Sequence, residues 1–131
     1  MRKDIDIPEV KDVHVAVVRE FNKEFRSDEW NAYIINNRGI SIEMILIVAR
    51  GFEGKKETST MRRKLEKLPP HSFAKIEYMQ DEVTALNNEF LVTFFAENRM
   101  FEKKFFFPKN SISEDVATTI PVIPKKGVLA E

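Results

Sequence analysis

The sequence predicts an α+β domain that is built on a mostly antiparallel sheet of about six strands. Several runs of about eight residues alternate apolar and polar positions, as half-buried strands do, and turn-forming residues separate them. One further segment repeats apolar residues at the spacing of an α-helix. With 131 residues, the chain is expected to fold as a single domain over residues 1–131 that needs no disulfide.

The run from Ile42 to Gly51 is the predicted centre of the sheet. Simple alternation makes this strand apolar on both sides, with one polar residue near its start. Its two sides would be formed by Ile42, Met44, Leu46 and Val48 and by Ile45, Ile47 and Ala49. Such a strand is normally covered on both sides, so we expect Leu46 in the central core. The run is too short to cross a bilayer, which needs roughly 20 apolar residues.

The first part of the chain is expected to supply two more strands. Residues 1–11 are of mixed charge and would lie extended along an edge. Alternating valines predict a strand over residues 12–21, and residues 30–36 predict the second strand. The Asn-Asn-Arg-Gly sequence at 36–39 contains residues that tolerate positive φ, as a hairpin loop requires. The second strand would therefore pair antiparallel with the central strand.

Residues 58–68 are predicted to form the one amphipathic helix. Three apolar side chains recur at i, i+4 and i+7 and would make a single stripe; they are Met61, Leu65 and Leu68. The Thr-Ser-Thr run at 58–60 offers N-caps for this helix, and Pro69 with Pro70 would end it.

The second half of the chain is predicted to add three strands and a short helix. The strands are expected at residues 72–79, 90–96 and 100–107, with a tight turn between the last two. Residues 80–89 fit one or two helical turns almost as well as a continued strand, and both alternatives stay open. A short C-terminal helix would span residues 113–119. The similar order of elements in the two halves leaves a duplicated β-β-β-α unit as a minor alternative.

Two small helices can cover only one face of such a sheet. The central strand and the last hairpin are apolar on both faces, and Phe105, Phe106 and Phe107 are consecutive. The other face must be closed by curling of the sheet, by a ligand or by a second subunit. Since twofold dimers are the commonest soluble oligomers, we expect a homodimer joined through a sheet face or edge that contains these phenylalanines. Phe105 and Phe107 face opposite to Phe106, so the sequence leaves open which of them lie at the interface.

No catalytic or metal site can be identified from the sequence, and no cofactor is expected. The chain has no cysteine, and its only histidines, His14 and His71, have no metal-binding spacing. With four glycines it contains none of the glycine-rich phosphate-binding motifs. Paired carboxylates for acid–base catalysis would have to come from Asp28, Glu29, Glu43, Glu77, Asp81 and Glu82. Such a pair needs a defined separation in space, which sequence distance does not give, so we favour ordinary local roles for these residues.

One segment of the chain is strongly basic. Residues 50–67 contain seven lysine or arginine residues against three glutamates. The side chains that could contact phosphates are Lys55, Lys56, Arg62, Arg63 and Lys67. However, solvated helix faces are commonly basic, and the whole chain has 21 basic and 21 acidic residues and hence no net charge. Nucleic acid and membranes are therefore not the expected partners.

Three stretches of the sequence resemble a family of small bacterial single-domain proteins with no established function. They are DVHVAVVREFNKEF (12–25), DEWNAYIINN (28–37) and IEMILIVARGFEGKKETSTMRRKLEKLP (42–69). Some members of that family are described as phenylalanyl-tRNA synthetase alpha subunits. This chain does not support that description, since it is far too short for a class II synthetase core and shows no ATP-binding arginine motif. The resemblance implies a stand-alone domain and assigns no residue to a site.

These observations lead to three ranked expectations for function. The first is a cytoplasmic, non-enzymatic binding or interaction domain that acts as a homodimer. A cytoplasmic location is expected because the charged N-terminus, MRKDIDIPEVKD, lacks the apolar core of a signal peptide. The second is a small-ligand-binding domain, or less readily an enzyme, with an apolar pocket on the concave face of a curled sheet. The third is an RNA-associated domain that uses the basic segment 55–67.

Overall fold

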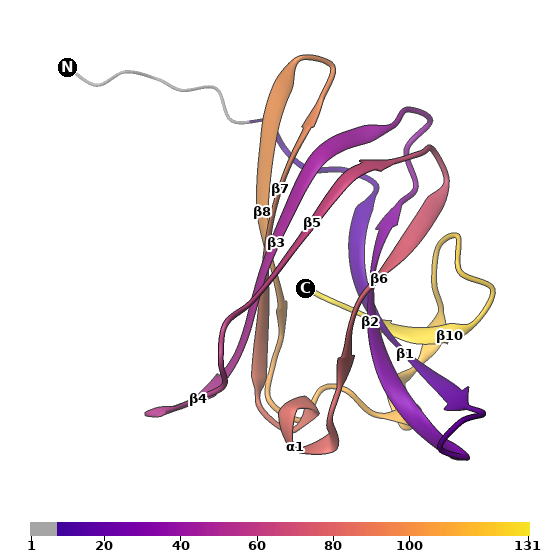
Figure 1. Cartoon of the computed structure of the whole chain (residues 1–131), viewed down its shortest axis with the longest axis vertical. Coiled ribbons are helices and arrows are strands. Elements are labelled where there is room, and N and C mark those ends of the chain that lie inside the picture. The colour runs from indigo at the N-terminus through magenta and orange to yellow at the C-terminus, as the bar shows by residue number, and fades with distance from the viewer. Residues whose placement is uncertain (1–7) are drawn as a thin grey trace.

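The computed structural model describes residues 8–131, which form two antiparallel sheets packed face to face (Figure 1). Sheet A has the strand order β6 (Ser72–Met79), β2 (Ser27–Asn36), β1 (Val13–Asn22), β10 (Lys126–Leu129) and β9 (Thr118–Thr119). Sheet B has the order β4 (Lys56–Glu57), β3 (Ile42–Glu53), β7 (Asn87–Ala96) and β8 (Arg99–Phe107), and β5 (Met61–Leu68) also pairs with β3. Helical turns in this part of the chain are limited to α1 (Asp81–Thr84) and the 3₁₀ turn η1 (Glu114–Val116). The architecture is a β-sandwich.

The predicted α+β class is therefore wrong, although the predicted antiparallel pairing is confirmed. Residues 58–68 form no helix, because β5 is extended and pairs with β3 from its first residue to its last. The spacing that suggested a helix also fits a strand: Met61 and Leu65 are an even number of residues apart and so lie on one face. The predicted C-terminal helix at 113–119 is reduced to η1. The duplicated β-β-β-α alternative is lost together with the helix, and residues 80–89 divide into α1 and the start of β7.

The predicted hairpin between the second and central strands is instead a crossing between the two sheets. β2 pairs with β1 and β6 in sheet A, whereas β3 lies in sheet B. Asn36 is fully buried at this crossing. Its Nδ2 donates to the carbonyl groups of Ile40, Leu68 and Pro69 at 3.0, 3.1 and 3.0 Å. One side chain thereby satisfies backbone groups of both the β2–β3 and the β5–β6 crossings.

β3 is the central strand of sheet B, but its alternation is interrupted at Met44, which has a φ of 50°. As a result Ile42 and Ile45 are both buried although they lie three residues apart. Beyond this irregularity Ile47 faces sheet A with none of its surface exposed, while Leu46 lies half-buried on the outer face of sheet B. The expected place of Leu46 in the central core is therefore wrong. The left-handed residue shifts the phase of the strand, and simple alternation cannot anticipate such a shift.

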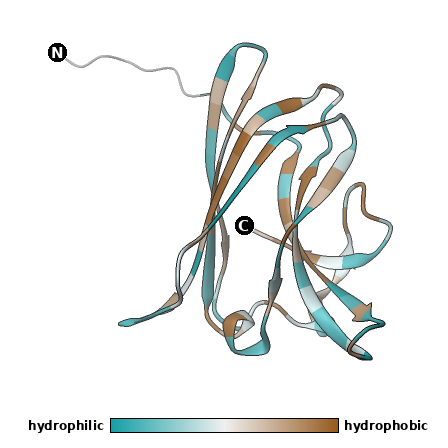
Figure 2. Cartoon of the chain, viewed as in Figure 1, coloured by the Kyte–Doolittle hydropathy of each residue, from teal (hydrophilic) through white to brown (hydrophobic). Residues whose placement is uncertain are grey.

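Apolar side chains from both sheets fill the space between them. Along the strands, apolar residues alternate with polar ones (Figure 2), and the apolar set of each sheet points to the other sheet. The largest fully buried side chains include Phe90, Phe94 and Phe107 of sheet B. The two sheets thus cover each other's inner faces. From the sequence, a curled sheet, a ligand or a second subunit was expected to cover the second apolar face.

The outer face of sheet A is covered by the chain between β8 and β10. Ile120 and Ile123 of this segment pack on Ala16, Val18 and Ile35, which point outward from sheet A. This small cluster is separate from the main core and gives sheet A a second covered face.

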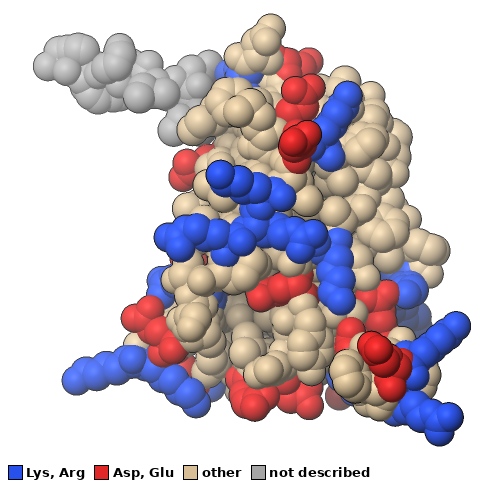
Figure 3. Space-filling view, viewed as in Figure 1, with Lys and Arg blue, Asp and Glu red and all other residues tan. Residues whose placement is uncertain are grey.

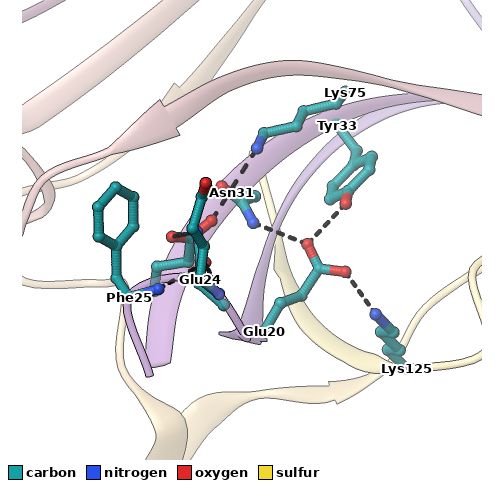
Figure 4. A network of polar contacts seen from close by, with 9 residues as sticks. Glu20, Glu24, Phe25, Asn31, Tyr33, Lys75 and Lys125 are labelled. Carbon is teal, nitrogen blue, oxygen red and sulfur yellow. Dashed lines mark hydrogen bonds and ion pairs between the residues drawn. The ribbon is translucent and has the colours of Figure 1, made fainter. Parts of the chain in front are cut away.

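A polar network fixes this cover to the sheet (Figure 4). Glu20 Oε1 accepts hydrogen bonds from the Tyr33 hydroxyl at 2.6 Å and from Asn31 Nδ2 at 2.8 Å. Glu20 Oε2 pairs with Nζ of Lys125, which belongs to the covering segment. Burial alone would raise the pKa of Glu20, but the hydrogen bonds outweigh burial and hold this pKa below its ordinary value.

The chain end closes one side of the sandwich. Glu131 and Phe106 exchange two backbone hydrogen bonds, of 2.8 and 3.2 Å, so the last residue extends sheet B beside β8. The outer face of sheet B has no comparable cover within residues 8–131. The predicted edge segment 1–11 lies outside the described residues up to residue 7, and residues 8–11 belong to no strand. In the described chain no helix is long and apolar enough to cross a membrane.

Candidate functional site

The outer face of sheet B carries a group of apolar side chains from three strands. They are Met44, Leu46 and Val48 of β3, Leu91 and Phe95 of β7, and Met100 of β8, and together they are called the sheet B patch. The strand register places Val48 beside Leu91 and Phe95 beside Met100. The exposed fractions of Met44, Met100 and Phe95 are 69%, 53% and 41%. Large apolar side chains that gather on one uncovered face mark an interaction surface.

Met44 is the most exposed member of the patch, and its backbone is strained. Its φ of 50° lies in the left-handed region, which costs a residue other than glycine about 1–3 kcal/mol. The register between β3 and β7 shifts between Glu43 and Leu46, at the same point. Irregularities of this kind re-aim side chains, and here Met44 is turned into solvent while Ile45 stays in the core. A strained residue that exposes a large apolar side chain does not stabilise the monomer, and this points to a role in binding.

Met44 forms a ridge between two hollows. The first has a volume of about 660 Å³ and is lined by residues of β3 and β5, among them Leu46 and Leu65. The second, of about 310 Å³, lies between Met44, Phe95 and the turn that joins β7 to β8. Two identical surfaces that each have a ridge beside a hollow can interlock about a twofold axis, because the ridge of each copy enters a hollow of the other.

Charged side chains border the patch on two sides. Arg62 and Lys64 of β5 flank it along one border, and Glu102 and Lys104 of β8 flank it along the other. Lys64 and Glu102 lie in the same row across the sheet, at opposite borders. An apolar centre with a charged rim is the usual anatomy of a protein interface.

An ion-pair cluster ends the patch toward the far end of β3. Arg50 contacts Glu89 at 3.2 Å and Glu57 at 3.4 Å. Its guanidinium lies 4.3 Å from the centre of the Phe52 ring, and this ring packs on Phe106 with 6.4 Å between the ring centroids. These groups satisfy one another within the chain, so they do not require a partner.

Of the three phenylalanines predicted at an interface, only Phe106 lies on the outer face of sheet B. Phe105 and Phe107 are core residues with exposed fractions of 3% and 1%. Neither can contribute to a surface unless the sandwich opens. Sequence reasoning found the strands that carry the patch, but it missed the residues that form it, because simple alternation could not tell which face of β3 and of the β7–β8 hairpin stays uncovered.

The five basic residues that the sequence offered as possible phosphate contacts do not share a helix face. Lys55 and Lys56 lie at the hairpin between β3 and β4, and Arg62, Arg63 and Lys67 lie on β5. Lysine and arginine side chains form a band across this side of the molecule (Figure 3). β5 has β3 as its one strand neighbour, and charges along such an edge prevent pairing with strands of other molecules. This gives the band a structural role.

The histidines do not form a site with other ligands. Burial lowers the pKa of His14, an effect that Asp12 opposes and Lys103 reinforces. His71 Nδ1 lies 3.2 Å from Asn37 Oδ1 at the surface. Over residues 8–131, no group of three or more His, Asp or Glu side chains could hold a metal ion.

Comparison of the chain with protein-family models, with curated proteins and with solved structures found no match. The resemblance to a family of small bacterial proteins therefore stays a prediction.

Proposed function

We propose that this chain is a non-enzymatic binding domain that acts as a homodimer, in which the sheet B patches of two copies pack against each other. The observation that carries the proposal is Met44, a strained residue that holds a 69% exposed side chain between two hollows. Burial of Met44 in the hollow of a second copy would offset the backbone strain with apolar burial.

The charged borders contribute both an attractive and a repulsive pair when two copies meet. A twofold axis that runs parallel to the strands places the β5 border of one copy over the β8 border of the other. Lys64 of one copy then faces Glu102 of the second copy, since both lie in one row of the sheet, and Arg62 faces Lys104, since they share the next outward-facing row. The apolar patch, and not the rim, therefore carries the proposed contact. Rim pairs of this kind contribute to specificity and association rate more than to affinity.

The size of the face sets the expected strength of association. Four strands about 4.8 Å apart, over about seven residues at about 3.3 Å each, give a face of roughly 20 by 23 Å. This is at the low end of specific interfaces, so we expect a reversible dimer with a dissociation constant in the micromolar range.

The two other expectations have less support. Core side chains of both sheets fill the space between them, so packing does not favour an apolar pocket on a concave inner face. The basic residues lie on a hairpin and an edge strand, where solvation and edge protection account for them.

Sedimentation velocity over a dilution series from about 100 μM to about 1 μM tests the proposal. We expect the wild-type mass to fall from twice 15.3 kDa toward 15.3 kDa across the series. Met100→Lys should remain monomeric throughout. The control is Phe25→Lys, which removes a 74% exposed aromatic ring from the β1–β2 turn and should associate as the wild type does. A wild type that is monomeric at every concentration would refute the proposal, and so would association of Met100→Lys at wild-type strength.

A further inference from the structure

A second candidate site lies at the open side of the sandwich, between the edge strands β5 and β6. It is a cleft of about 420 Å³ below the band of basic residues (Figure 3). Glu77, Gln80 and the hydroxyl-bearing residues 58–60 supply its polar lining, and Met61 and Val83 supply an apolar wall. The cleft is on a different side of β3 from the sheet B patch, so the two sites are independent.

A bulge in β6 directs Glu77 into this cleft. The register between β2 and β6 shifts so that Ala32 pairs with Glu77 and Tyr33 pairs with Lys75. Ile76 is therefore an extra residue, and Ile76 and Glu77 both turn toward sheet B. Ile76 enters the core, where it is 2% exposed, and Glu77 stays half-buried at the cleft.

The wall of the cleft opposite Glu77 is formed by residues 58–60, which connect β4 to β5 and belong to no strand. Gly51 N–H donates to Thr58 Oγ1 at 2.8 Å, and Thr58 N–H donates to Gly51 O at 2.9 Å. The Thr58 hydroxyl donates its one proton to Ser59 O at 3.1 Å, so this hydroxyl is held in place by the backbone. The hydroxyls of Ser59 and Thr60 remain available at the exposed rim of the cleft.

No cation of the described chain neutralises Glu77. Arg50 lines the cleft, but its guanidinium is held by Glu57 and Glu89 on the outer face of sheet B. Arg63 reaches β6, where it donates to the backbone carbonyl of Ile76 at 3.3 Å. Burial consequently raises the pKa of Glu77, with no neighbouring charge to offset it. A half-buried carboxylate without a partner is costly for the free protein, and a cationic ligand would remove that cost.

We propose that this cleft binds a small organic amine. The ammonium group has three N–H donors, which Glu77 and the hydroxyls of Ser59 and Thr60 can accept. A short apolar body attached to the amine fits against Met61 and Val83. An anionic ligand of the same size is disfavoured, because its charge would meet the Glu77 carboxylate, while the Arg50 guanidinium that lines the cleft is already paired with Glu57 and Glu89.

The test is a titration of the full ¹⁵N-labelled chain with n-butylammonium chloride to about 50 mM at constant ionic strength, followed by amide NMR. We expect saturable shifts at the amides of Gly51, Ser59 and Glu77. Sodium pentanoate and 1-butanol, which have the same butyl group without the ammonium group, should give no saturable shifts at these amides.

Three variants make the result specific to the cleft. Glu77→Gln keeps the shape of the side chain and should weaken amine binding by about 10-fold or more, since a charge-assisted hydrogen bond is lost. Glu66→Gln removes an exposed carboxylate of β5 and should bind as the wild type does. The double variant Ser59→Ala with Thr60→Val changes only exposed side chains and should also weaken binding, which keeps the test valid if Glu77→Gln unfolds. Absence of saturable shifts with the amine, equal shifts with 1-butanol, or undiminished binding by folded Glu77→Gln would each overturn the proposal.

Discussion

Asn36 Nδ2 donates a hydrogen bond to the carbonyl oxygen of Leu68 at 3.1 Å and so links the two places where the chain crosses between the sheets. The same nitrogen also reaches Ile40 and Pro69, and Asn36 Oδ1 accepts from the Arg38 N–H at 3.0 Å. Both crossings come from loops that would otherwise bury backbone groups without partners. A single amide therefore holds the corner at which sheet A and sheet B are joined.

Replacement of this amide should weaken the fold markedly. Asn36→Ala leaves carbonyl groups of both crossings without a buried donor, and we expect the free energy of unfolding to fall by about 2–4 kcal/mol. Asn37→Ala, the neighbouring change, removes only a surface contact with His71 and should cost about 0.5 kcal/mol or less. Urea denaturation of the two variants measures the difference, and equal midpoints would show that the corner does not depend on Asn36.

The shift in the alternation of β3 at Met44 leads to opposite predictions for two adjacent residues, Leu46 and Ile47. Ile47 is completely buried between the sheets, so Ile47→Ala should cost about 2–5 kcal/mol. Leu46 lies half-buried on the outer face, so Leu46→Ala should cost about 1 kcal/mol when measured on the monomer near 1 μM. Chemical denaturation at that concentration decides the order. A larger loss of stability for Leu46→Ala than for Ile47→Ala would show that Leu46 and not Ile47 faces the core, as simple alternation from Ile42 requires.

The Glu20 network should make stability depend on pH. In the folded protein the pKa of Glu20 lies below its ordinary value of 4.5, because hydrogen bonds from Lys125, Tyr33 and Asn31 outweigh the effect of burial. The ionised carboxylate therefore stabilises the protein above the unfolded-state pKa, and this contribution disappears as the pH falls below 4.5 through the lower folded-state pKa. Glu20→Gln should lower the free energy of unfolding by about 1–3 kcal/mol at pH 7.

The gap between Glu20→Gln and the wild type should narrow as the pH is lowered from about 5 toward 3. Glu114→Gln serves as the control, because Glu114 has a 71% exposed side chain 3.6 Å from Arg19 and should change stability little at any pH. A constant gap between Glu20→Gln and the wild type over this range would contradict the assigned role of the carboxylate.

Period-2 alternation predicted most of the strands, and this part of the fold could be read from the sequence. Val13, Val15 and Val17 face the core as alternation requires, and the hairpin between β7 and β8 turns at Glu97 and Asn98, which both have positive φ. The segment from Met61 was assigned to a helix because spacings of four residues fit both periods. Pairing with a neighbouring strand decides between a helix and a strand here, and β3 pairs with this segment along its whole length.

The pairing of strands between sheets could not be predicted in the same way. Asn36 begins a crossing and not a hairpin because distant acceptors at Leu68 and Pro69 satisfy its side chain, and local turn chemistry does not reveal them. The patch was hidden for a related reason. Its centre depends on the left-handed φ of Met44, a conformation that nothing in the side chain of methionine favours. The cleft was hidden too, because the bulge at Ile76 redirects Glu77.

The central claim is that Met44 is held in a strained conformation for association, and Met44→Asn separates strain from association. Asparagine tolerates positive φ, so the change relieves backbone strain while it removes the apolar ridge. Near 1 μM, where the wild type is expected to be monomeric, the free energy of unfolding of Met44→Asn should equal or exceed that of the wild type by up to about 1 kcal/mol.

The decisive measurement is the dissociation constant of Met44→Asn from sedimentation over about 1–100 μM, beside the wild type under the same conditions. The account predicts that the variant associates at least about 10-fold more weakly than the wild type while it remains fully folded. A folded Met44→Asn that dimerises with the affinity of the wild type would contradict the account, because the strained, exposed side chain would then have no part in the interface.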